Sequence, residues 1–111
     1  MPVADKLIQV AETYGFDGWF INQETEGAEE RTLTRDDTVK MQEFIKYFKK
    51  QAPEMRLVYY DSMTSEGKMD WQNALTDKNT MFMTDEEGNA VADEMFLISG
   101  GQRMSWRIKI F

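Results

Sequence analysis

Two polar side chains close together at the end of an apolar run are the clearest sign of chemistry in this chain. Asn22 and Glu24 follow the run Gly-Trp-Phe-Ile at residues 18–21. Side chains alternate along a β-strand with a period of two, so Phe20, the amide and the carboxylate share one face, and Trp19 lies on the other. A carboxylate placed in this way can transfer protons. The pair can also simply begin a solvated loop, and the strand pattern alone leaves both interpretations open.

The flanking sequence predicts an α/β arrangement that would hold this pair at one edge of a sheet. Apolar residues at helical spacing predict a helix over residues 4–14, and Gly15 stands where a C-cap glycine belongs. A strand follows over residues 16–22. The later elements that we expect are a helix at 36–51, a strand at 56–61, an irregular stretch and a strand near 94–98. In α/β barrels this order of helix, glycine turn and strand presents reactive groups at the carboxyl ends of the strands.

Composition excludes several classes of chemistry. The 111 residues contain no cysteine and no histidine, and the formal net charge is −7. Disulfides, cysteine nucleophiles, histidine bases and zinc sites built on either residue are therefore excluded, which leaves carboxylates for proton transfer near neutral pH. The acidic balance argues against a nucleic-acid partner, and no apolar run approaches the ~18 residues of a membrane span. The acidic stretch at residues 85–89 lacks the spacing of an EF-hand loop, and we expect no metal or other cofactor.

Three blocks of sequence resemble one enzyme family. They are Gly-Phe-Asp-Gly-Trp-Phe-Ile-Asn-Gln-Glu-Thr at residues 15–25, Val-Tyr-Tyr-Asp-Ser at 58–62 and Trp-Gln-Asn-Ala-Leu at 71–75. In this order they resemble the catalytic region of the glycoside hydrolase family 85 endo-β-N-acetylglucosaminidases. These enzymes cleave the GlcNAc-β-1,4-GlcNAc core of N-linked glycans. The resemblance extends over about residues 4–97.

The resemblance implies a role for each candidate residue. Most glycosidases use two carboxylates, whereas this strand end offers one carboxylate and one amide. That departure fits a retaining reaction in which the substrate's own 2-acetamido oxygen attacks and forms an oxazolinium ion. By resemblance, Glu24 is the general acid/base, Asn22 orients the acetamide and Tyr60 reaches the acetamide or oxazoline. Trp71 and Trp19 are the candidate substrate-binding residues, and an N-linked glycan or glycoprotein is the substrate. Without the family, Trp71 is equally consistent with core packing.

The length of the chain conflicts with a whole barrel. A complete (β/α)₈ TIM barrel needs about 250 residues, and the elements expected here amount to two or three βα units from its middle. We therefore expect residues 1–97 to be a fragment of the catalytic domain that is inactive alone. The alternative is a non-catalytic carbohydrate-binding or structural fragment, such as a pseudogene product or one part of a split barrel.

The last fourteen residues differ in character from the rest. Residues 98–111 include three basic residues and no acidic one, and they match neither barrel periodicity nor the family. One possible coding of this tail, read one base out of frame, gives Asn-Phe-Trp-Trp-Thr-Glu-Asp-Glu-Leu-Ala-Asp-Gln-Asp-Ile. That would be a strand ending in aromatic residues, followed by an acidic helix start. We interpret residues 98–111 as a frameshifted tail without a function of its own; a genuine basic tail is the alternative.

Overall fold

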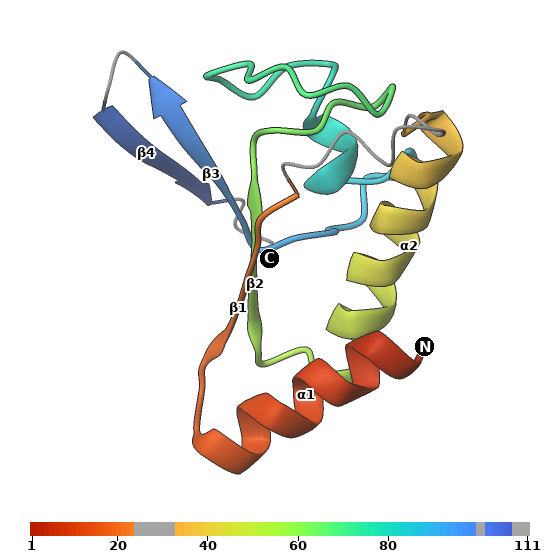
Figure 1. Cartoon of the computed structure of the whole chain (residues 1–111), viewed down its shortest axis with the longest axis vertical. Coiled ribbons are helices and arrows are strands. Elements are labelled where there is room, and N and C mark those ends of the chain that lie inside the picture. Colours follow the sequence, from red (N-terminus) through yellow and green to blue (C-terminus); the bar gives the residue numbers. More distant parts are fainter. Residues whose placement is uncertain (24–32, 100–101, 108–111) are drawn as a thin grey trace.

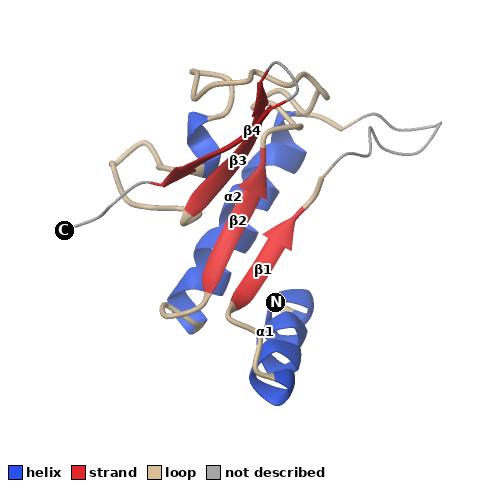
Figure 2. Cartoon of the chain, turned by 90° about the vertical axis from the view of Figure 1, so that its left-hand side faces the viewer, coloured by secondary structure: helices blue, strands red, loops and turns tan. Residues whose placement is uncertain are grey.

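The sheet and its helices form two layers. The structure, a computed structural model, describes residues 1–23, 33–99 and 102–107, and from residue 98 onward it describes the backbone alone. The strands in this part of the chain are β1 (Gly18–Ile21), β2 (Arg56–Tyr60), β3 (Glu94–Ser99) and β4 (Gln102–Arg107). The helices are α1 (Pro2–Tyr14), α2 (Arg35–Gln51) and the short 3₁₀ helix η1 (Thr80–Phe82). Both α-helices lie on the same side of β1 and β2 (Figure 1), and α2 lies behind the sheet in Figure 2.

The first three strands are parallel and neighbours in the sheet. The sheet order is β1-β2-β3-β4, with β1–β2 and β2–β3 both parallel. The two strands β1 and β2 approach closely at Gly18, where a Cβ atom would lie 1.8 Å from the carbonyl oxygen of Arg56. Because the strands are parallel, their carboxyl ends meet at one edge of the sheet, at the top of Figure 1. This arrangement confirms the prediction of an α/β unit with a parallel sheet.

Local capping signals explain where the helices begin and end. Gly15 ends α1 with a left-handed φ of 77°, and its amide donates to the carbonyl oxygen of Ala11 at 2.8 Å. Glycine adopts this conformation without the steric cost that a Cβ would add. At the start of α2, the Thr34 amide donates to the Asp37 carboxylate at 2.8 Å. Both helices were predicted, and α1 begins two residues earlier than expected.

The hydrophobic core lies between the sheet and the helices. Its centre includes Tyr59, whose ring stacks on Phe82 with centroids 4.2 Å apart. The other buried apolar residues come from α1, α2, β2, β3 and the connections between them: Ala4, Ala11, Ile45, Phe48, Ala52, Met55, Leu57, Met63, Met83, Val91, Ala92, Met95 and Leu97. This core packs against one face of the sheet, and the described residues cover the opposite face only in part, since Phe20 there is 46% exposed.

Strand β4 was not expected. Its residues lie in the segment that we interpreted as a frameshifted tail, for which we predicted no strand. In the structure β4 pairs antiparallel with β3 from Glu94↔Arg107 to Ser99↔Gln102. The signal that could have indicated a hairpin is the Gly-Gly pair at residues 100–101, because such pairs are typical of two-residue hairpin loops. An antiparallel neighbour also differs from the all-parallel sheet of a TIM barrel.

Candidate active site

The face of the sheet away from the helices carries a cluster of three aromatic rings. Phe20, Tyr60 and Phe96 come from the three parallel strands. Their centroids are 5.9 Å apart for Phe20–Tyr60, 5.5 Å for Phe20–Phe96 and 6.1 Å for Tyr60–Phe96. We call this side of the sheet the open face. Phe20 remains 46% exposed, so the cluster forms an apolar wall that is only partly covered by the described residues.

Two of the predicted site residues lie at the carboxyl ends of adjacent strands. The β1–β2 register ends at Ile21↔Tyr59, so the next positions along the chain are Asn22, directly after β1, and Tyr60, the last residue of β2. Asn22 is exposed, and Tyr60 is 8% exposed with its ring in the aromatic cluster. The structure therefore brings an amide and a phenol to the same edge of the open face.

Tyr59 and Tyr60 are adjacent in the sequence and occupy different environments. Tyr59 is fully buried in the core, and its hydroxyl donates to the Met63 carbonyl at 3.4 Å. Burial, and secondarily the charge of Asp61, raises the pKa of Tyr59 far above its ordinary value. Of this pair, only Tyr60 lies on the open face, with its ring in the aromatic cluster.

The carboxylate of the predicted pair, Glu24, lies outside the described residues. The first described range ends one position before it, at Gln23. The Ser62 hydroxyl donates a hydrogen bond to the Gln23 carbonyl. Ser62 follows β2 by two residues, so this bond links the two strand ends that carry Asn22 and Tyr60.

A buried carboxylate organises the segment that follows β2. Asp61 is 1% exposed and accepts hydrogen bonds from the Asn73 amide at 2.8 Å and from the Asn79 side chain at 3.0 Å. The same Asn79 amide group donates to the Ala74 carbonyl at 2.8 Å. Sequence reasoning quoted Asp61 within a motif but assigned it no role. The available signal was an acidic residue directly after an apolar strand.

This segment presents Trp71 near the carboxyl ends of the strands. Trp71 is 44% exposed, and it lies two positions before Asn73, whose backbone amide donates to the Asp61 carboxylate. Its exposure argues against simple core packing, the alternative that the sequence left open. In Figure 1 the segment that connects β2 to η1 passes over the carboxyl-terminal edge of the sheet.

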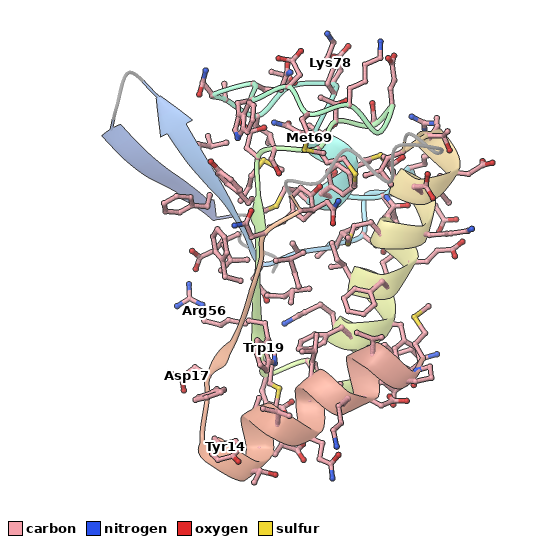
Figure 3. All side chains as sticks on the ribbon, viewed as in Figure 1. Tyr14, Asp17, Trp19, Arg56, Met69 and Lys78 are labelled. Atoms are coloured by element: carbon pink, nitrogen blue, oxygen red, sulfur yellow. The ribbon has the colours of Figure 1, made fainter. Side chains whose placement is uncertain are left out.

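Trp19 lies apart from the other predicted site residues. Its indole N–H donates to the Leu7 carbonyl of α1 at 2.9 Å, and its ring packs against the hydrophobic core. Figure 3 shows Trp19 on the helix side of β1 and Arg56 on the other side. The structure does not bring Trp19 together with Asn22 and Tyr60, so a direct contact with substrate at that edge has no support from its position.

The amino-terminal part of the open face is polar. Arg56 forms an ion pair with Glu94, and an open hollow of about 400 Å³ beside it is lined by residues of all three parallel strands. The lining residues are Gly18, Trp19, Phe20, Arg56, Val58 and Glu94. Phe20 and Val58, which are paired between β1 and β2, lie between this ion pair and the strand ends that carry Asn22 and Tyr60.

Acidic side chains outside the strand ends form hydrogen-bonded turns and ion pairs. Among the described residues, no group of three or more acidic side chains is arranged to hold a metal. The Asp85 carboxylate is bonded to Lys46 at 2.8 Å and to the amides of Glu87 and Asn89, and these bonds, first that to Lys46, hold the pKa of Asp85 well below its ordinary value. The acidic stretch at 85–89 is thus a hydrogen-bonded turn.

The helices in the described ranges are all too short or too polar to span a membrane.

Comparison with a solved structure shows which class of protein has this arrangement. The glycoside hydrolase domain of Endo-D from Streptococcus pneumoniae R6 superposes on 90% of this chain with a TM-score of 0.77 and 35% sequence identity. The superposed part is 16% of that domain's chain. The fold is therefore that of a segment of a glycoside hydrolase domain.

Sequence comparison then identifies the family. The profile of glycosyl hydrolase family 85 matches residues 1–98, and the chain belongs to this family. It is 38% identical over 79 residues to the cytosolic endo-beta-N-acetylglucosaminidase of Danio rerio, and 33% identical over 86 residues to that of Mus musculus. These alignments cover 71% and 78% of this chain and 11% of each relative.

Proposed function

We propose that this chain supplies the catalytic strand ends of an endo-β-N-acetylglucosaminidase that hydrolyses the GlcNAc-β-1,4-GlcNAc core of N-linked glycans. The observation that carries the proposal is the placement of Asn22 and Tyr60. They lie at adjacent carboxyl ends of parallel strands, within the residues that the family profile matches. Sheets of this kind bind ligands at the carboxyl ends of their strands.

The proposed reaction is retaining and uses the substrate's acetamide as nucleophile. Glu24 donates a proton to the glycosidic oxygen as the bond from C1 to that oxygen breaks. The acetamide oxygen forms the new bond to C1, which yields an oxazolinium ion. Glu24, now a carboxylate, removes a proton from the attacking water. The water oxygen bonds to C1, and the acetamide is released with the configuration at C1 retained.

Asn22 and Tyr60 stabilise the acetamide in this proposal. The acetamide group is a better nucleophile when an acceptor holds its N–H and when its carbonyl oxygen is aligned with C1. The amide oxygen of Asn22 can accept that N–H, and the Tyr60 hydroxyl can donate to the developing ring. Tyr60 is suited to this because its ring is fixed between Phe20 and Phe96. A fixed ring needs little reorganisation when the substrate binds.

The aromatic side chains provide the sugar-binding surface in the proposal. Trp71 is exposed beside the strand ends and offers a flat apolar face to the C–H side of a pyranose. We further propose that the open face, with Phe20, Tyr60 and Phe96, turns toward the interior of a (β/α)₈ barrel. The parallel strands and the helices on one side support this, since they are the arrangement found in such a barrel.

A graft tests the proposed function in a complete domain. In this grafted domain, residues 1–98 replace the matching segment of the Streptococcus pneumoniae Endo-D domain. After circular dichroism has shown that it is folded, it is incubated with a high-mannose glycopeptide. We expect mass spectrometry to show a peptide that retains one GlcNAc. A folded grafted domain that binds the glycopeptide without cleaving it would favour the non-catalytic carbohydrate-binding alternative.

Replacement of the amide tests the role of Asn22. In the grafted domain, Asn22→Ala should lower kcat by about 10²–10³-fold, the usual cost of losing one group that stabilises the reacting atoms. Substrate binding should change little, because the sugar contacts remain. The check is a comparison of kcat with the Kd for a non-hydrolysed glycan. Asn89→Ala removes an amide from the distant turn and should leave both unchanged; loss of folding in Asn22→Ala would instead mark Asn22 as structural.

Removal of the buried carboxylate tests the anchor of the Trp71 segment. Asp61→Ala leaves the Asn73 amide and one Asn79 donor without their acceptor. A buried donor that loses its partner costs about 1–3 kcal/mol, and Asn79 is fully buried. We expect a lower urea midpoint in the grafted domain and faster proteolysis within residues 62–79. Asp77→Ala removes the same charge from an exposed position and should change neither measurement. Equal stability of the two variants would show that Asp61 is not an anchor.

A further inference from the structure

Asn22 and Gln23 lie beyond the last residue of β1 that is paired with β2. The parallel ladder between β1 and β2 ends at the pair Ile21↔Tyr59. Past that pair, the hydrogen bond from the Ser62 hydroxyl to the Gln23 carbonyl joins the two strand ends. The Gln23 carbonyl belongs to the peptide unit that connects Gln23 to Glu24. A hydrogen bond to this carbonyl therefore restrains the orientation of the backbone on which Glu24 is mounted.

Ser62 is well placed to act as a fixed donor. It is fully buried, and its backbone is held on both sides. Its amide donates to the Tyr60 carbonyl at 2.8 Å, and its carbonyl accepts from the Asp70 amide at 2.9 Å. The neighbouring Asp61 amide donates to the Phe96 carbonyl of β3 at 3.0 Å. The hydroxyl thus projects from a backbone that is bonded to β2, to β3 and to the Trp71 segment.

We infer that Ser62 is a positioning residue that sets the relative placement of Asn22 and Glu24. This inference rests on the proposed function, because it assigns Ser62 an effect that is exerted through those two residues. Ser62 itself is buried behind the strand ends and does not contact the substrate. Proton transfer requires the acid within hydrogen-bond distance of the glycosidic oxygen, and a misplacement of about 1 Å can cost about 10²-fold in rate.

The first test separates turnover from binding. In the grafted domain, Ser62→Ala should lower kcat by about 10–10²-fold with KM changed by less than about threefold, because the sugar-binding contacts are retained. Ser62→Thr keeps the hydroxyl and should recover much of the rate. Ser62→Cys keeps the size but donates weakly, and should remain slow even if the alanine variant folds poorly. Ser65→Ala is the matched control, since Ser65 is bonded through its backbone amide and carbonyl.

The second test is a double-mutant cycle with Glu24→Gln. If Ser62 acts by placing Glu24, removing the hydroxyl should cost little once the acid has already been removed. A residue that merely supports the fold would reduce the rate by the same factor in both backgrounds. We therefore expect Ser62→Ala to lower the rate less than about twofold in the Glu24→Gln variant, and at least about tenfold in its absence.

The outcomes distinguish this inference from the function on which it rests. A folded grafted domain without glycosidase activity contradicts the proposed function. An active grafted domain in which Ser62→Ala keeps full kcat contradicts only the role of Ser62. A loss of rate that matches the loss of folded protein, or that is equally large in the Glu24→Gln background, also overturns the inference. The inference is supported if kcat falls in both Ser62→Ala and Ser62→Cys, recovers in Ser62→Thr, and changes little on Ser62→Ala in the Glu24→Gln background.

Discussion

Replacing Glu24 with glutamine in the grafted domain should reduce hydrolysis of a high-mannose glycopeptide by about 10²–10⁴-fold. Glutamine has nearly the same shape as glutamate but cannot donate a proton to the leaving oxygen or accept one from water. Substrate binding should be largely kept, so the loss should appear in kcat. Initial rates measured by release of the glycan give the comparison.

The chemistry predicts how that loss can be bypassed. A preformed sugar oxazoline has already passed the step that needs the acid, and an activated aryl leaving group departs without strong protonation. Both substrates should react in Glu24→Gln with a much smaller deficit than the natural glycopeptide. Glu12→Gln, in α1 on the other side of the sheet, should behave as the unaltered domain. Full activity of Glu24→Gln on the glycopeptide would remove Glu24 from the mechanism.

The 111-residue chain by itself should be self-associated or only partly folded, and without endoglycosidase activity. Its helix side is packed, whereas Phe20 stays exposed on the open face, and β1 is a terminal strand of the sheet among the described residues. Apolar burial contributes about 25 cal/mol per Å², and net domain stability is only about 5–15 kcal/mol. A partly exposed wall of aromatic rings should therefore lower the net stability by a large fraction. Size-exclusion chromatography with light scattering and a thermal melt provide the check.

Two phenylalanine variants locate the cause of self-association. Phe20 and Phe16 are exposed to similar extents, 46% and 50%, but only Phe20 lies in the aromatic cluster of the open face. Phe20→Ser should therefore reduce self-association more than Phe16→Ser does. A monomeric, cooperatively melting chain that releases glycans would refute the view that the open face needs further cover.

Local signals in the sequence were sufficient for most of the fold. Helical periodicity with a C-cap glycine predicted α1, and the alternation of side chains placed Phe20 and Trp19 on opposite faces, as the structure shows. The parallel arrangement of β1 and β2 followed from the helix between them. The helix and the alternation of side chains depend on neighbours within a few residues, which can be recognised in a sequence directly. The parallel pairing depends on the connection between the strands, and the helical periodicity of α2 identifies it as a crossover.

The contacts that organise the candidate site could not be predicted in the same way. Ser62 and Gln23 are 39 residues apart, and Asp61 and Asn79 are 18 apart. A serine or an aspartate after a strand has many possible partners, and only the folded backbone selects one. The position of Trp19 also depended on tertiary structure, because its indole finds a carbonyl acceptor on α1. Sequence reasoning identified it as an aromatic residue near the site and assigned it to substrate.

We propose that residues 98–111 result from a change of reading frame. The family profile ends at residue 98, the position at which we infer a change of reading frame. The antiparallel pairing of β4 also differs from what a barrel strand would do at this edge. The nucleotide sequence around the Ile98 codon, read in all three frames, tests the proposal. A frame that continues the family sequence supports it, and the absence of such a frame contradicts it.

The stereochemistry of the first-formed product tests the central claim most directly. The grafted domain is mixed with a high-mannose glycopeptide, and the anomeric proton of the newly released reducing GlcNAc is followed by NMR before mutarotation. Participation of the acetamide through Asn22 and Glu24 predicts that the β-anomer forms first. Appearance of the α-anomer first would show direct displacement by water, and it would contradict the mechanism proposed for this chain.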